Sequence, residues 1–244
     1  MAEPNLNAGL EKAFWLIPTY LSNLLRLISG PKRFIAERLS GDQSPVENAW
    51  VFLALSVLMG WLLELPFAKF GLFWELARDG GFSVIFAIVF GGALYLAWHW
   101  VGGRAELRKF LTISFYYGGA LKLMMTMLFL AIIGTMETVS PSLYTEFLTA
   151  ATNGTFALFL KDHLDQIPSS SAYQWSLWVQ VPGFAGMLAW LIAAWGGYRQ
   201  LYKVSRMRSA AAGLLFVILC LPAAALTFVI ANSLVAPPPH GVEK

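Results

Sequence analysis

The chain has 244 residues, of which 57% are hydrophobic and 13% are charged, and its mean hydropathy is +0.60. An average soluble domain is about 45–50% apolar and about 25% charged, so this composition excludes a soluble globular enzyme, a disordered tail and a nucleic-acid-binding domain. The formal net charge is only +3, which indicates no polyanionic partner and no nucleic acid. We therefore expect an integral membrane protein.

Residues 1–48 are predicted to form a cytoplasmic N-terminal segment that holds an amphipathic interfacial helix. Over residues 18–29, Pro18 suits the first helical position and apolar side chains recur at helical spacing. These side chains share one face: Leu21, Leu24, Leu25 and Ile28. A second short helical stretch is expected over Lys32–Leu39. A basic amphipathic element is typical of a helix on the cytoplasmic leaflet, and the alternative is a docking helix for a protein partner. No cleavable signal is recognised, so the N-terminus is expected to be retained.

Five segments are apolar and long enough to cross a bilayer, which takes about 20 helical residues for roughly 30 Å of hydrocarbon. They are Ala49–Phe67, Phe82–Val101, Phe110–Gly134, Gln174–Tyr198 and Ala210–Val235. None alternates as the strands of a membrane barrel do, and an open sheet would leave unpaired amides in lipid. The predicted fold is all-α, a polytopic five-transmembrane-helix bundle over residues 49–235 with flanking interfacial amphipathic helices. Residues 236–244 would form a short exterior tail.

The connection over residues 135–173 is too long for a structureless loop, so it is expected to hold two short helices on the outer face. One should follow Ser140-Pro141, and the other should cover Thr155–Leu164. A sixth span is disfavoured because the apolar stretch Phe147–Leu160 has only 14 residues.

The basic residues predict the orientation, because cytoplasmic loops of membrane proteins carry an excess of Lys and Arg. Twelve of them precede the first span or lie in the second-to-third and fourth-to-fifth connections: Lys12, Arg26, Lys32, Arg33, Arg38, Arg104, Arg108, Lys109, Arg199, Lys203, Arg206 and Arg208. The other side would hold four: Lys69, Arg78, Lys161 and Lys244. The N-terminus is therefore predicted to be cytoplasmic and the C-terminus exterior, in the plasma (inner) membrane if the chain is prokaryotic.

Several tryptophans fall at the predicted span ends, where the amphipathic indole favours the membrane–water interface. The cytoplasmic ends hold Trp50, Trp98, Trp100 and Trp195, and an outer end holds Trp175 and Trp178. Interfacial anchoring is the expected role of these residues.

Lys122, close to the midpoint of the third span, is the charge that most needs an explanation. A cation at bilayer depth costs a few kcal/mol even on lenient insertion scales, so its side chain should face protein or water. At 1.5 Å per residue, Lys122 lies roughly 18 Å and Glu64 about 22 Å from the cytoplasmic ends of their spans. We expect a Glu64–Lys122 ion pair, with Tyr116, Tyr117 and Gln180 as accessory polar partners.

Small neighbours surround Lys122 on its helix and are expected to let another helix approach closely, namely Gly118, Gly119 and Thr126. Three interpretations of Lys122 stay open: a structural tether between spans, part of a cavity for a substrate or lipid headgroup, or a snorkelling side chain. We favour the tether.

Catalytic motifs are absent from the sequence. There is no HExxH, no paired cysteine, no GxGxxG and no Walker pattern, so no phosphate cradle, cofactor or metal site is predicted. The three histidines, His99, His163 and His240, lie in unrelated regions, and no catalytic residue is assigned. The chain is expected not to be an enzyme.

Three stretches resemble the Yip family of five-span membrane proteins, which are named for interaction with Rab-type GTPases, and the prokaryotic branch is the most similar. The stretches are GPKRF (Gly30–Phe34), SFYYGGALKL (Ser114–Leu123) and WGGYRQLYKVSRMRSAAAGLL (Trp195–Leu215). The resemblance covers nearly the whole chain. It implies a compact five-helix bundle with a cytoplasmic N-terminus, partner binding and no catalytic residue set.

The expected function is a scaffold or organiser that binds other membrane proteins or lipids. The alternative is a small transporter, channel or lipid-handling protein with a polar pocket around Lys122. Membrane lipids and other membrane proteins are the expected partners, and the small residues of Ser209–Gly213 would permit homo-oligomerisation.

Overall fold

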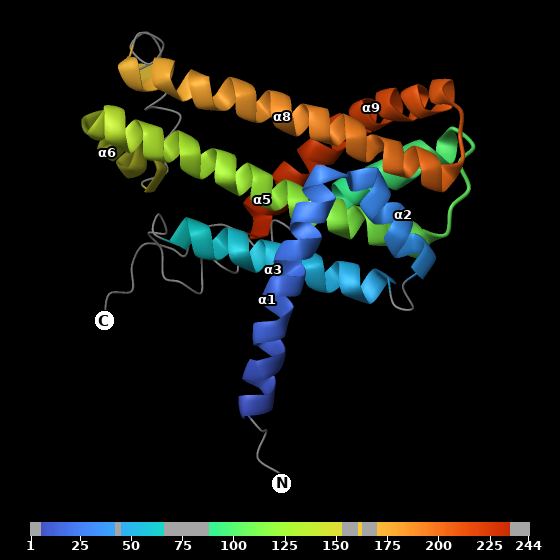
Figure 1. Cartoon of the computed structure of the whole chain (residues 1–244). Coiled ribbons are helices and arrows are strands. Elements are labelled where there is room, and N and C mark those ends of the chain that lie inside the picture. Colours follow the sequence, from blue (N-terminus) through green and yellow to red (C-terminus); the bar gives the residue numbers. More distant parts are fainter. Residues whose placement is uncertain (1–5, 42–44, 66–87, 153–160, 163–169, 235–244) are drawn as a thin grey trace.

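The computed structural model describes residues 6–41, 45–65, 88–152, 161–162 and 170–234, and every regular element among them is helical. The labelled helices are α1 (Leu6–Ser29), α2 (Pro31–Gly41), α3 (Pro45–Glu64), α5 (Leu107–Val139), α6 (Pro141–Thr152), α8 (Ser171–Tyr202) and α9 (Arg206–Leu234). A further apolar helix covers Ile88–Trp100. Figure 1 shows α3, α5 and α8 running side by side, with α1 crossing α3 steeply. The all-α prediction is confirmed for this part of the chain.

In the part of the chain that the structure describes, four helices are long and apolar enough to cross a membrane: Val46–Glu64, Leu107–Val139, Tyr173–Tyr202 and Arg206–Ala225. They coincide with the first, third, fourth and fifth predicted spans. Of the second predicted span, residues 82–87 lie outside the described residues, and the helix Ile88–Trp100 that remains is shorter than a crossing requires.

The helix ends follow the sequence chemistry closely. The α5 helix ends at Val139 because Pro141 cannot continue it, and Pro141 then opens α6 at the first helical position. Ser170 caps α8 by accepting a hydrogen bond from the backbone N–H of Tyr173. Thus α6 is the predicted helix after Ser140-Pro141, whereas most of the predicted helix over Thr155–Leu164 lies outside the described residues.

The α3 and α5 helices run in the same direction, and their contacts are in register along both. Near their N-terminal ends, Arg108 pairs with Glu47 at 2.8 Å. Further along both helices, the ring centroids of Phe52 and Tyr116 lie 5.1 Å apart. This parallel pair forms the most extensive helix contact, and α8 packs on the other side of α5.

The N-terminal helices pack against the bundle along part of their surface, and their position on the cytoplasmic leaflet stays a prediction. In α1 Tyr20 and Leu27 are buried, and in α2 Phe34 and Ile35 are buried. The α1 helix begins at Leu6, so Pro18 lies inside it and not at its first position. The predicted apolar face is divided: Leu24 packs against the core, while the exposed face holds Ile17, Leu21, Leu25 and Ile28.

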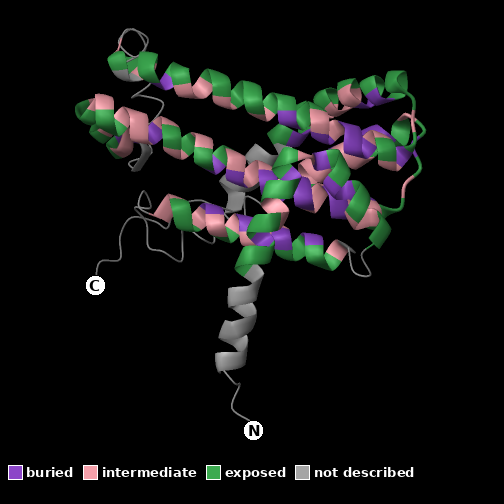
Figure 2. Ribbon diagram, viewed as in Figure 1, coloured by how far each residue is buried: buried purple, intermediate pink, exposed green. Residues whose placement is uncertain are grey.

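The core is concentrated in one half of the bundle. In Figure 2 the buried residues gather around α2 and the adjoining parts of α3, α5 and α8, while the remaining helix surfaces are exposed or intermediate. Those surfaces carry large apolar side chains, among them Trp178 at 76% exposure and Ile192 at 68%. Contiguous exposed apolar surface on this scale is suited to contact with lipid.

The tryptophans divide between two environments. Trp50, Trp100, Trp175 and Trp178 are exposed, as interfacial anchors should be. Trp98 is fully buried instead, and its ring stacks on Tyr202 with centroids 5.2 Å apart. The anchoring role predicted for Trp98 is therefore wrong, because its indole packs between helices.

Candidate functional site

The predicted Glu64–Lys122 ion pair is present in the structure. Glu64 is the last residue of α3 and Lys122 lies near the middle of α5, and Nζ of Lys122 is 3.3 Å from Oε1 of Glu64. The two side chains are 21% and 28% exposed, so the protein covers most of each. Thr126, one turn after Lys122, donates its hydroxyl to the same carboxylate oxygen at 2.7 Å. Glu64, Lys122 and Thr126 therefore form one polar cluster that joins α3 to α5.

Glycines bring the two helices close enough for this cluster to form. A methyl group on Gly60 would lie 3.0 Å from Cε of Lys122 and 3.2 Å from Oγ1 of Thr126. A methyl group on Gly119 would lie 2.7 Å from Oγ of Ser56. Gly118 is different, since its nearest neighbour would be Cδ1 of Leu53 at 3.8 Å, an ordinary contact. Of the two predicted packing glycines, only Gly119 is at a tight contact.

Two of the accessory residues predicted for Lys122, Tyr117 and Gln180, bind other partners. Tyr117 donates its hydroxyl to the backbone carbonyl of Pro31 at 3.4 Å. Gln180, on α8, donates its amide to Oγ of Ser176 at 2.9 Å. Tyr116 is buried between two rings, 5.0 Å from Phe34 and 5.1 Å from Phe52. The partner that the structure adds to the ion pair is Thr126, which was predicted only as a packing residue.

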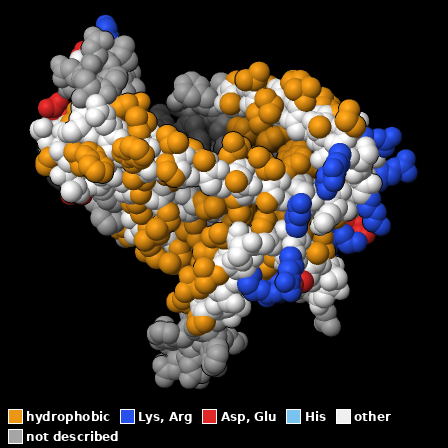
Figure 3. Space-filling view, turned by 45° about the horizontal axis from the view of Figure 1, so that its top comes forward, with side chains coloured by type: hydrophobic (Ala, Val, Ile, Leu, Met, Phe, Trp, Pro, Cys, Tyr) orange, Lys and Arg blue, Asp and Glu red, His pale blue; other side chains and the backbone are white. Residues whose placement is uncertain are grey.

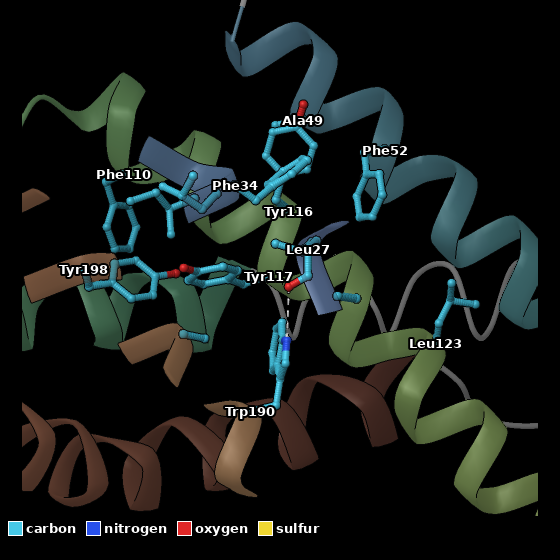
Figure 4. Packing of buried hydrophobic residues seen from close by; sticks show 14 of the residues in the cluster. Leu27, Phe34, Ala49, Phe52, Phe110, Tyr116, Tyr117, Leu123, Trp190 and Tyr198 are labelled. Atoms are coloured by element: carbon cyan, nitrogen blue, oxygen red, sulfur yellow. Dashed lines mark hydrogen bonds between the residues drawn. The ribbon is translucent and has the colours of Figure 1, made fainter. Parts of the chain in front are cut away.

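A second group of polar contacts joins the helical hairpin of α1 and α2 to α3, α5 and α8. The hydroxyls of Tyr20 and Ser56 share a hydrogen bond of 2.9 Å, which ties α1 to α3. The indole N–H of Trp190 on α8 donates to the carbonyl of Leu27 at 3.4 Å, as drawn in Figure 4. Together with the Tyr117–Pro31 bond, these contacts hold the Gly30-Pro31 turn inside the bundle.

Aromatic rings fill the space around that turn. The ring of Tyr117 meets Trp190 and Tyr198 edge to face, each at 5.6 Å (Figure 4). Gly196 and Gly197 on α8 leave room for the Lys32 side chain and for the Tyr117 hydroxyl, which a methyl group at either position would overlap. This packing around the Gly30-Pro31 turn was not predicted from the sequence. Its signals were the tyrosine pair of α5 and the glycine pair of α8, which lie in two of the stretches that resemble the Yip family.

The chemistry available to the Glu64–Lys122–Thr126 cluster is electrostatic. A single charge inside a membrane span is costly, and the opposite charges of Glu64 and Lys122 compensate each other there. The Thr126 hydroxyl donates to a further lone pair of the carboxylate. In the part of the chain that the structure describes, no group of three or more His, Cys, Asp or Glu side chains gathers as a metal site would require. The cluster can thus join two helices or present a dipole to a ligand.

Comparison with protein-family models, with curated protein sequences and with solved structures finds no match to this chain. Three features of the molecule bear on its function: the Glu64–Lys122–Thr126 cluster, the packed N-terminal hairpin and the distribution of charge along the bundle.

Proposed function

We propose that this chain is a non-enzymatic integral membrane protein of the Yip type, acting as a scaffold or organiser that binds other membrane proteins or lipids. The observation that carries the proposal is that Lys122 and Glu64 face each other across a helix contact sealed by Gly60 and Gly119. A side chain that serves transport has to be released to a ligand, whereas these charges hold α3 against α5. The similarity of SFYYGGALKL and WGGYRQLYKVSRMRSAAAGLL to Yip stretches supports the same assignment.

A five-span topology is part of the proposal, and the direction of the helices supports it. Since α3 and α5 run the same way, the chain has to return to the starting end of the bundle between Glu64 and Leu107. The apolar helix Ile88–Trp100 belongs to that returning segment. One crossing between two parallel spans, added to the four long apolar helices, makes five.

The orientation we propose places the N-terminus in the cytoplasm and the C-terminus outside, in the plasma (inner) membrane if the cell is prokaryotic. Figure 3 shows Lys and Arg gathered at one end of the bundle, beside an extended apolar surface. These residues come from α2, from the start of α5 and from the turn between α8 and α9. An excess of basic residues is typical of the cytoplasmic end.

Cysteine labelling tests this orientation, because the chain has only one native cysteine, Cys220. In a Cys220→Ser background, Ser205→Cys places a thiol at the basic end, and Ser142→Cys places one on α6; both serines are exposed. We expect a membrane-impermeant maleimide to label Ser142→Cys in intact cells and Ser205→Cys only after permeabilisation. The background protein should remain unlabelled in both conditions. The reversed pattern would contradict the orientation.

The scaffold function is tested by purifying the tagged protein from its native membranes in lipid nanodiscs and identifying bound proteins and lipids by mass spectrometry. A scaffold is supported if one protein co-purifies at a stoichiometric level with the wild-type chain and with the exposed control Ser40→Ala. The same protein should be lost from the purification of Tyr117→Ala. Tyr117 is chosen because it seats the N-terminal hairpin on α5 and α8.

The alternative is a transporter, channel or lipid-handling protein with a polar pocket at Lys122, whose side chain is 21% exposed. The same purification distinguishes it. Recovery of one enriched small molecule or lipid and no protein partner, with that ligand absent from Lys122→Met, would establish the alternative and overturn the scaffold.

A further inference from the structure

Four exposed cations lie in two adjoining connections, three where α8 turns into α9 and one shortly before α5. They are Arg104, Lys203, Arg206 and Arg208, and we refer to them as the turn cluster. All four are exposed, and none forms an ion pair with another residue that the structure describes. A concentration of one charge sign without local compensation raises the local concentration of anions.

Several other basic residues at the same end form ion pairs within the protein. Arg26 and Arg33 both pair with Glu37. Arg108 pairs with Glu47 at 2.8 Å, and Lys109 pairs with Glu106 at 2.9 Å. Lys32, Arg38 and Arg199 likewise form no ion pair with a residue that the structure describes, but Arg38 and Arg199 are only half-exposed. The turn cluster therefore holds most of the exposed cations at this end that lack a carboxylate partner.

The two segments that carry the turn cluster are held against each other. A methyl group on Gly103 would lie 2.6 Å from the ring of Tyr202, so the connection before α5 packs directly on the end of α8. Nη1 of Arg208 passes within 3.6 Å of a methyl position on Gly102, which has φ +83°. The rings of Trp98 and Tyr202 stack with their planes only 1° from parallel, which joins the two segments. The cations therefore project from a fixed platform.

Large apolar side chains lie beside the turn cluster. Met207 is 82% exposed between Arg206 and Arg208, and Trp100 is 60% exposed just before Gly102. A soluble anion gains nothing from such side chains, whereas a lipid presents a charged phosphate next to an apolar chain. We propose that the turn cluster binds the phosphate of anionic lipid headgroups, with Met207 and Trp100 lying at the level where the acyl chains begin.

This inference rests on the proposed membrane function and deepens it by naming a lipid class. Its test compares two triple variants that remove the same charge: Lys203→Gln/Arg206→Gln/Arg208→Gln in the turn cluster, and Arg33→Gln/Arg108→Gln/Lys109→Gln among the ion-paired residues. The purified proteins in neutral detergent are titrated with dioctanoyl phosphatidylglycerol, with dioctanoyl phosphatidylcholine and with inorganic phosphate. Bound lipid is counted by native mass spectrometry.

We expect the wild-type protein to prefer phosphatidylglycerol to both other probes. Each charge lost from the turn cluster should weaken that binding about fivefold, so the triple variant should lose roughly a hundredfold, and the matched variant should stay within about threefold of wild type. If the triple variant does not fold, the single variant Arg206→Gln replaces it in the titration, with an expected loss of affinity for phosphatidylglycerol of about fivefold. Thermal unfolding without lipid identifies any variant that fails to fold.

Three outcomes would overturn the inference. Equal losses in the two triple variants would show attraction by net charge alone. Binding of inorganic phosphate as tight as that of phosphatidylglycerol would show an anion site without a lipid. No preference for phosphatidylglycerol over phosphatidylcholine would show that no headgroup phosphate is recognised through its charge. A scaffold that fails its purification test leaves these lipid titrations unaffected, so the two proposals fail separately.

Discussion

Glu64→Gln and Lys122→Met will each lower the free energy of unfolding, and the exchanged variant Glu64→Lys/Lys122→Glu will recover part of the loss. Each single change leaves one charge of the pair without its counter-ion in a water-poor environment, at a cost of about 3 kcal/mol. For a chain of this size that corresponds to roughly 6–12 °C in Tm. The measurement is thermal unfolding of the purified variants in one detergent, together with their abundance in membranes.

A second ion pair between the same helices supplies the control. Arg108 and Glu47 also join α5 to α3, at 2.8 Å, but their side chains are 58% and 61% exposed. Charges so open to solvent are worth about 0–1 kcal/mol as a pair. Glu47→Gln and Arg108→Gln should therefore change Tm by a few degrees at most, while the changes at Glu64 and Lys122 are several-fold larger.

The exchanged variant decides whether the effect comes from the pairing itself. Opposite charges are restored across the contact with their positions reversed, and Thr126 can accept from an ammonium as readily as it donates to a carboxylate. The single variants Glu64→Lys and Lys122→Glu complete the cycle, and a coupling energy of about 1–3 kcal/mol is expected between the two positions. An exchanged protein no more stable or abundant than either single variant would show that the two charges act independently.

The ion pair could be predicted from the sequence because depth along a membrane helix is fixed by the rise per residue. Lys122 and Glu64 are the charges inside predicted spans, and their depths agree. Depth carries no information about which side of a helix faces which neighbour. Tyr117 and Gln180 were therefore assigned to the wrong partners, since Tyr117 faces α2 and α8, and Gln180 bonds to Ser176 on its own helix.

The packing of the N-terminal hairpin against the bundle could not be predicted, for a physical reason. In a soluble protein an apolar face identifies the side that packs, but in a membrane protein lipid and protein interior are equally apolar. Leu24 and Leu25 are neighbours in the same leucine-rich stretch, yet Leu24 packs against the core and Leu25 is 68% exposed. The same ambiguity explains Trp98, whose position at a span end fits an interfacial anchor as well as a buried ring.

Gly119→Ala will destabilise the protein, whereas Gly118→Ala will not, although the two glycines are adjacent on α5. A methyl group on Gly119 would lie 2.7 Å from Oγ of Ser56 and 3.0 Å from the ring of Phe52, so one of them has to move. Ser56 is held by its bond to Tyr20 and Phe52 by its packing on Tyr116. Overpacking of this kind costs about 1–3 kcal/mol.

Gly118→Ala is the matched control, because its methyl group would meet only Cδ1 of Leu53 at 3.8 Å. Alanine is a better helix former than glycine by about 1 kcal/mol, so this variant should be as stable as wild type or more so. Thermal unfolding of both proteins in one detergent measures the difference. Equal stability of the two variants would mean that α3 and α5 can separate at Gly119 without cost. Such a contact could open to admit a ligand at Lys122. That result would favour a polar pocket at Lys122 over a structural tether between the two helices. A loss confined to Gly119→Ala instead identifies a fixed contact, which is what an ion pair serving only to join two helices requires.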